Sequence, residues 1–177
     1  MAKRRQRPTP EEFKQTDKEA ENLHPRSAVI LLTSQLELFL DDAIFESLAR
    51  NEDDLIARLI DSNGPLSSFS SKILIAYALG VISKDTRGDL DILRNVRNEF
   101  AHSPRPIDFY TPEISDRIEN LKCIKRKKYI KLKRPAQMLG VKFDPVREKF
   151  TDACELLSLQ LNGKRPAKSK AVFRILE

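Results

Sequence analysis

Apolar residues recur at helical spacing along most of the chain. Between residues 26 and 50 they follow each other three or four positions apart, which predicts a long core helix. The residues expected on its buried face are Val29, Leu32, Leu36, Phe39, Leu40 and Ala43. A last helix is expected from Pro145 to Asn162-Gly163, with its apolar face formed by Phe150, Ala153, Cys154, Leu157 and Leu161. Both patterns favour an all-α fold.

Helix-start signals place further elements between these two. A hydroxyl residue followed by proline and then by acidic residues is typical of a helix start. This signal predicts one helix from Thr9-Pro10 to about Asn22 and another from Thr111-Pro112 to about Lys122. Two more helices are expected over 52–60 and over 84–102, the latter ending near His102 because Ser-Pro-Arg-Pro follows. Lysines partly alternate with apolar residues over 127–133, which permits a strand there.

The stretch from Ser70 to Ser83 is apolar nearly all round. For so short a segment this predicts a buried helix with Gly80 as its C-terminal stop, because a membrane span needs about 20 apolar residues. The serines before it, Ser67, Ser68, Ser70 and Ser71, are typical of a loop that caps a helix. A serine nucleophile is disfavoured because no histidine and acid are arranged nearby in the sequence.

These elements predict one all-α bundle of about six or seven helices over residues 10–162. A basic arm, residues 1–9, precedes it, a basic insertion, residues 122–134, interrupts it, and a basic tail, residues 163–177, follows. The N-terminus lacks the apolar stretch of a secretory signal, so we expect a cytoplasmic protein that does not enter membranes. Two histidines and two cysteines are too few for a predicted metal site or disulfide framework, and no cofactor motif is present.

Charge is distributed unevenly along the chain. The acid-free segments 1–7, 122–134 and 163–176 hold 17 of the 32 basic residues, and the remainder has 15 basic and 26 acidic residues, a net charge of −11. Such separation indicates contact with a polyanion, with DNA or RNA as the first candidate and an acidic protein or the body of a second subunit as the next. The predicted nucleic-acid contacts are Lys122, Lys125, Arg126, Lys127, Lys128, Lys131, Lys133 and Arg134.

Two neighbouring stretches carry a family resemblance. Residues 63–83 contain P-L-x-x-F-S and Y-x-L-G, and residues 89–121 contain R-N-x-F-A-H followed by an aromatic and acidic segment. In order and spacing, over residues 24–125, they resemble the mannitol operon repressor family. The resemblance implies an all-helical fold and a role in transcriptional repression, partly through protein partners and without a helix-turn-helix. Basic segments would then contact phosphates, which supply affinity without reading bases.

The run Arg97-Asn98-Glu99-Phe100-Ala101-His102 also resembles the motif of the HEPN superfamily. In that alternative the protein is a metal-independent ribonuclease, in which His102 acts as general acid or base, Arg97 stabilises phosphorane charge and Asn98 orients the imidazole. One motif supplies too few groups, so two subunits would form the site. The competing interpretation is structural, with Arg97 and Asn98 paired with acids on neighbouring helices and His102 capping the C-terminus of its helix.

Self-association is expected on independent grounds. The helix containing residues 73–79 and the helix containing Arg97 offer more apolar face than so small a bundle covers, which predicts a homodimer. A third functional class also fits the pattern, namely a protein-interaction module whose basic arms bind an acidic partner. A regulator with nucleic-acid or protein contacts is the function that the sequence favours.

Overall fold

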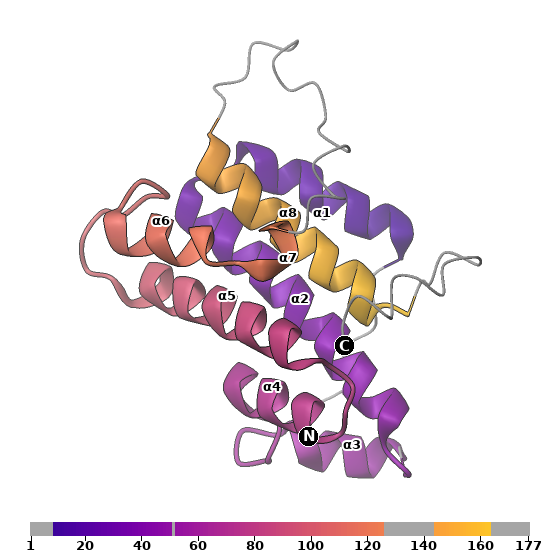
Figure 1. Cartoon of the computed structure of the whole chain (residues 1–177). Helices are drawn as coiled ribbons and strands as arrows, with labels where there is room; N and C mark the ends of the chain where they lie inside the picture. Colours follow the sequence, from indigo (N-terminus) through magenta and orange to yellow (C-terminus); the bar gives the residue numbers. More distant parts are fainter. Residues whose placement is uncertain (1–8, 51, 126–143, 164–177) are drawn as a thin grey trace.

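The computed structural model describes residues 9–50, 52–125 and 144–163, which form eight α-helices and no strand (Figure 1). The all-α fold predicted from the sequence is therefore confirmed. The elements are α1 (Pro10–Asn22), α2 (Pro25–Ser47), α3 (Asp53–Ile60), α4 (Phe69–Ala78), α5 (Lys84–His102), α6 (Pro112–Glu119), α7 (Lys122–Lys125) and α8 (Pro145–Leu161). None of the described helices is long and apolar enough to span a bilayer.

Helix α2 forms the centre of the bundle. It packs against α1, α4, α5 and α8, and Figure 1 shows α1 and α8 along its upper half and α3 and α4 at its lower end. Its predicted apolar face is buried, with Leu36 and Leu40 fully enclosed and only Ala43 partly exposed. Burial of each such large side chain contributes about 1.5–3 kcal/mol to folding. The fold thus rests on the helical periodicity seen in the sequence.

Helix ends are secured by both local and distant groups. Thr9 is the N-cap of α1, as expected, and forms a capping box with Glu12, in which each side chain accepts a hydrogen bond from the other residue's backbone N–H. At the other end of α1, Nη2 of Arg147 on α8 donates to the carbonyls of Ala20 at 2.6 Å and Leu23 at 2.7 Å. These bonds satisfy carbonyls that a helix C-terminus leaves free.

The sequence-based predictions need correction at three places. Helix α6 ends at Glu119, earlier than the predicted Lys122, and Thr111 makes no side-chain cap but accepts a hydrogen bond from the backbone N–H of Asp108. The short helix α7 was not predicted and brings the described helices to eight. Helix α4 is buried on one face only, because it lies at the end of the bundle against α2 and α5. The possible strand at 127–133 lies outside the described residues.

Candidate interaction surface

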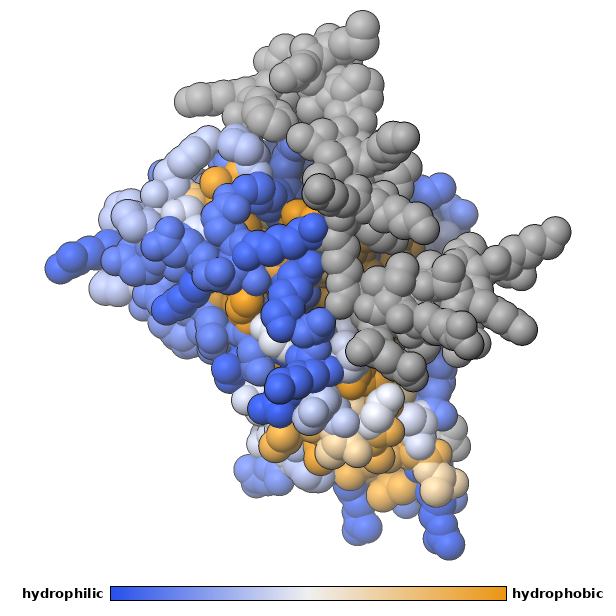
Figure 2. Space-filling model, in the orientation of Figure 1, coloured by the Kyte–Doolittle hydropathy of each residue, from blue (hydrophilic) through white to orange (hydrophobic). Residues whose placement is uncertain are grey.

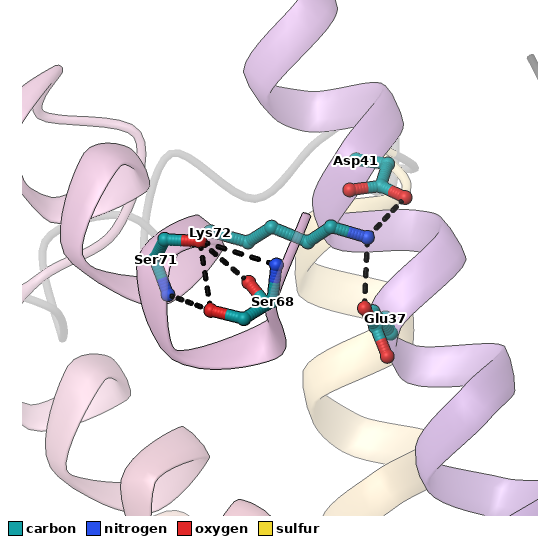
Figure 3. A network of polar contacts seen from close by, with 5 residues as sticks. All are labelled: Glu37, Asp41, Ser68, Ser71 and Lys72. Atoms are coloured by element: carbon teal, nitrogen blue, oxygen red, sulfur yellow. Dashed lines mark hydrogen bonds and ion pairs between the residues drawn. The ribbon is translucent and has the colours of Figure 1, made fainter. Parts of the chain in front are cut away.

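The serine-rich loop before α4 is a helix cap. Ser68 Oγ accepts a hydrogen bond from the backbone N–H of Ser71 at 3.1 Å, and Ser71 Oγ accepts one from the N–H of Ser68 at 3.3 Å (Figure 3). Gly64 lets the loop pass close to α3, since a Cβ there would lie 2.3 Å from the carbonyl oxygen of Leu59. The capping role expected of these serines is confirmed for Ser68 and Ser71.

Lys72 carries the only charge among the ten residues of α4, and it points into the molecule. Its side chain reaches α2, where Nζ lies 2.7 Å from Oε1 of Glu37 and 2.9 Å from Oδ2 of Asp41 (Figure 3). Lys72 is 7% exposed, so the ammonium is largely removed from water. A buried charge is tolerated when it is paired and hydrogen-bonded, and these two carboxylates supply both conditions. The network holds α4 against α2 in one orientation.

Burial in this network disfavours the charged form of the Asp41 carboxyl group. Burial raises its pKa to about 6, an effect that Lys72 opposes and the neighbouring charges of Glu37 and Asp42 reinforce. Its Oδ1 atom is buried and has no hydrogen-bond partner among the described residues. Because two carboxylates share one ammonium, the cluster has a net negative charge. Proton uptake by Asp41 neutralises that charge.

The opposite face of α4 is apolar and open to solvent. Leu74 is 55% exposed, Tyr77 is 36% exposed, and the cap residue Leu79 is 45% exposed. Gly80 ends the helix with a positive φ of 72°, and its N–H and that of Val81 bond back into the last turn. Figure 2 shows apolar side chains gathered at the lower end of the molecule, where α3 and α4 lie in Figure 1. These exposed apolar side chains make this face of α4 a candidate interaction site.

A charged rim on α5 borders this apolar face. The guanidinium carbon of Arg87 lies 5.0 Å from the centre of the Tyr77 ring, a cation–π geometry. Asp91 lies 3.8 Å from Nε of Arg87 and 3.7 Å from Nη2 of Arg94, so the rim presents both signs of charge. We name the exposed residues of α4 together with Leu79 and Arg87 the α4 surface.

The R-N-x-x-x-H motif lies on the last turns of α5. Arg97 is half-buried and its Nη1 donates to Oδ1 of the adjacent Asn98 at 3.5 Å, whereas His102 is exposed. Within the described residues the His102 side chain makes no hydrogen bond, so nothing there links it to Arg97 or Asn98. The end of α5 is instead tied down by Arg26, whose Nη2 donates to the carbonyl of Ser103 at 3.0 Å. A catalytic role for the three motif residues therefore stays a prediction.

The start of the basic insertion is docked on α5. Asp89, which is 2% exposed, accepts hydrogen bonds from the backbone N–H groups of Lys122 and Cys123, each at 2.8 Å, and thereby caps α7. The Lys122 ammonium also pairs with Asp85 at 2.6 Å, while the Lys125 side chain is exposed. The other predicted nucleic-acid contacts lie outside the described residues, namely Arg126, Lys127, Lys128, Lys131, Lys133 and Arg134.

The two cysteines show the properties of unreactive thiols. Both are free, and Cys154 is buried while Cys123 is half-buried. Burial raises the pKa of each thiol, and the Asp89 carboxylate raises that of Cys123 further. Among the residues that the structure describes, no group of three or more His, Cys, Asp and Glu side chains could hold a metal ion.

Two sets of contacts were not predicted from the sequence. They are the ion pairs of Lys72 with Glu37 and Asp41, and the capping of α7 by Asp89. Lys72 is one polar residue in an apolar run, and Asp89 lies 33 residues before the helix that it caps. A local signal exists only for Lys72, because a lysine at a position of the buried stripe needs an acidic partner on a facing helix.

Comparison with known proteins places this architecture in one family. Residues 17–149 match the family model described as "Mannitol repressor". The mannitol operon repressors of Escherichia coli K12 and of Escherichia coli O6:H1 are each 32% identical over 66 residues, which span 37% of this chain and about a third (34%) of each relative.

A solved structure shares the fold. It is the X-ray structure of the MtlR-HPr complex from Escherichia coli, which matches with a TM-score of 0.62 at 20% identity and covers 84% of this chain and 97% of that chain. The likeness extends over most of both chains, so the helix arrangement is common to them. Because the family model covers most of its length, including α2, α4 and α5, this chain belongs to the mannitol repressor family.

Proposed function

We propose that this chain is a transcriptional regulator of mannitol-repressor type that acts by binding a protein partner. The observation that carries the proposal is the family match over residues 17–149, which includes α2 to α7 in full, the end of α1 and the start of α8. A relative with the same helix arrangement has been solved in complex with HPr, so an HPr protein is the first partner to test. Such a regulator would work in the cytoplasm.

Charge supports a protein partner over direct contact between the bundle and DNA. Outside its three basic segments the chain has a net charge of −11, and the exposed start of α3 adds a local acidic group at Glu52, Asp53 and Asp54. An acidic body repels phosphate, whereas protein surfaces of either sign can be complementary to it. Contact with nucleic acid would therefore come from the insertion 122–134 and the arms 1–9 and 163–177, through phosphates.

Self-association is part of the proposal. In the single chain the α4 surface is uncovered, as the apolar pattern of residues 73–79 led us to expect. No contact of the His102 side chain within the described residues supports the ribonuclease alternative, which needs the Arg97, Asn98 and His102 side chains of two subunits in one site.

Two measurements test the proposed function. Calorimetric titration of the full chain with the HPr protein of the same organism should show saturable binding. In cells, deleting the gene should raise expression of a reporter driven by the mannitol-transport promoter, and restoring it should lower expression again. A chain that binds no HPr and leaves the reporter unchanged would refute the proposal.

A further inference from the structure

The exposed stripe of α4 is uncharged along its whole length. Four of its residues are exposed, namely Ser70, Leu74, Tyr77 and Ala78. The last three follow Ser70 by four, seven and eight positions, a spacing that puts all four on one side of the helix. Charged residues make up 33% of the chain, yet the single charge of α4, on Lys72, is held inside by Glu37 and Asp41. The ion pairs thus fix the rotation of α4 so that its neutral face points outward (Figure 3).

Side-chain size alternates along this stripe in a way that suits a copy of itself. Large Leu74 lies between small Ser70 and small Ala78, one helical turn away on either side. When two such helices pack antiparallel across a twofold axis, Leu74 of each can seat on Ala78 of the other. An interface about a twofold axis must be self-complementary, and this pattern meets that requirement. We therefore propose that the chain dimerises by packing α4 against α4 of a second copy.

The rim supports a second copy over other occupants. Arg87 is held on the Tyr77 ring and lies beside Asp91, so the border of the stripe offers a positive and a negative group together. Across a twofold axis, Arg87 of one copy can face Asp91 of the other. A polyanion would require a large excess of positive charge on the α4 surface, and the rim formed by Arg87, Arg94 and Asp91 has a net charge of only +1. The inference rests on the self-association in the proposed function and names the surface that produces it.

Sedimentation equilibrium of the full chain tests the α4 pairing. The parent should have twice the 20.3 kDa mass of one chain at tens of micromolar. Leu74→Arg should weaken the dimer by about 30-fold or more, the effect expected when a central interface residue is replaced by an unpaired charge. The matched control is Leu159→Arg on α8, since Leu159 is also exposed, at 38%, and should leave the dimer unchanged. Circular dichroism should show both variants folded.

A charge-pair rescue tests the antiparallel register. Ala78→Glu alone should also weaken the dimer, and a mixture of Leu74→Arg chains with Ala78→Glu chains should form heterodimers more tightly than either chain pairs with itself. A misfolded variant could not produce this result. A parent that is monomeric, or a dimer that is unaffected by Leu74→Arg, would overturn the inference, as would a mixture without rescue.

The HPr titration of Leu74→Arg separates this inference from the proposed function. We expect the variant to be monomeric and still to bind HPr, because the two activities use different surfaces. Loss of HPr binding with the dimer intact would identify the α4 surface as the site for the partner and would refute the α4 pairing. If the parent dimerises as described but never binds HPr, the proposed partner is wrong and the pairing stands.

Discussion

The Nζ atom of Lys72 on α4 lies 2.9 Å from Oδ2 of Asp41 on α2, an ion pair between residues 31 positions apart. With Glu37 as the second acceptor, this contact joins the helix that bears the α4 surface to the centre of the bundle. Its energetics and its consequences for α4 can be measured directly.

Replacing Lys72 by methionine should strongly destabilise the protein. The change leaves the carboxylates of Glu37 and Asp41 facing each other without a cation, and breaking a buried pair in this way costs about 3 kcal/mol or more. Urea denaturation at pH 7 measures the free energy of unfolding. Lys125→Met, at an exposed position, is the control and should change stability by less than about 0.5 kcal/mol. Equal effects of the two substitutions would contradict the role assigned to the buried pair.

Stability should fall as the pH rises from about 4 to about 6, through the contribution of Asp41. Its pKa in the folded state, about 6, lies above its ordinary value of 3.8, so the native state binds the proton more tightly in this range. Asp41→Asn keeps the Lys72–Glu37 pair and removes this contribution, which amounts to at most about 3 kcal/mol. The variant should therefore be at least as stable as the parent at pH 7, and this advantage should shrink toward pH 4.

The control for the pH measurement is Asp116→Asn, at an exposed position of α6. Its stability curve should run parallel to that of the parent. If Asp41→Asn also follows the parent at every pH, then Asp41 does not titrate as the buried geometry indicates.

Loss of the Asp89 carboxylate should detach α7 from α5. Asp89→Ala leaves the backbone N–H groups of Lys122 and Cys123 without their acceptor, and we expect a loss of about 2–3 kcal/mol. By contrast, Asp85→Asn removes the solvent-exposed pair with Lys122 and should cost less than about 1 kcal/mol. Hydrogen exchange of the α7 amides should rise in Asp89→Ala alone; unchanged protection there would refute the capping role.

Any binding to duplex DNA should depend on the insertion 122–134 and on salt. Four or five phosphate contacts predict that log affinity falls with log salt at a slope of about −4. Replacing Lys125, Arg126, Lys127 and Lys128 with glutamine should flatten the slope and weaken all sequences alike. Fluorescence anisotropy over a salt series measures both quantities. If the slope is unchanged in this variant, the insertion does not supply the phosphate contacts.

His102→Ala should have little effect on folding, and we expect no ribonuclease activity in the parent that this substitution could abolish. Because the side chain is exposed at the end of α5 and Arg26 binds the following carbonyl, the stability change should stay below about 1 kcal/mol. The purified parent should not cleave single-stranded RNA in the presence of EDTA. Cleavage that persists in EDTA and is lost in both His102→Ala and Arg97→Ala would instead establish the ribonuclease alternative.

Much of the secondary structure follows from interactions between near neighbours in the sequence. The capping box of Thr9 and Glu12, the Asp144 cap of α8 and the positive φ of Gly80 each involve groups a few residues apart. The buried stripe of α2 likewise repeats every three or four positions. These features could be predicted because local hydrogen bonds and periodic burial leave a readable pattern.

The contacts that join the helices to one another depend on residues far apart in the chain. Arg147 binds the carbonyl of Ala20 across 127 positions, and Asp89 makes a helix of Lys122–Lys125 that has no local start signal. An apolar run such as that of α4 predicts burial, but only the packing of α2 and α5 decides which of its faces is covered and which stays open. The sequence by itself therefore determined the helices and their buried stripes, whereas the tertiary structure decided the charge pairs and the exposed α4 surface, because desolvation and pairing depend on distances in space.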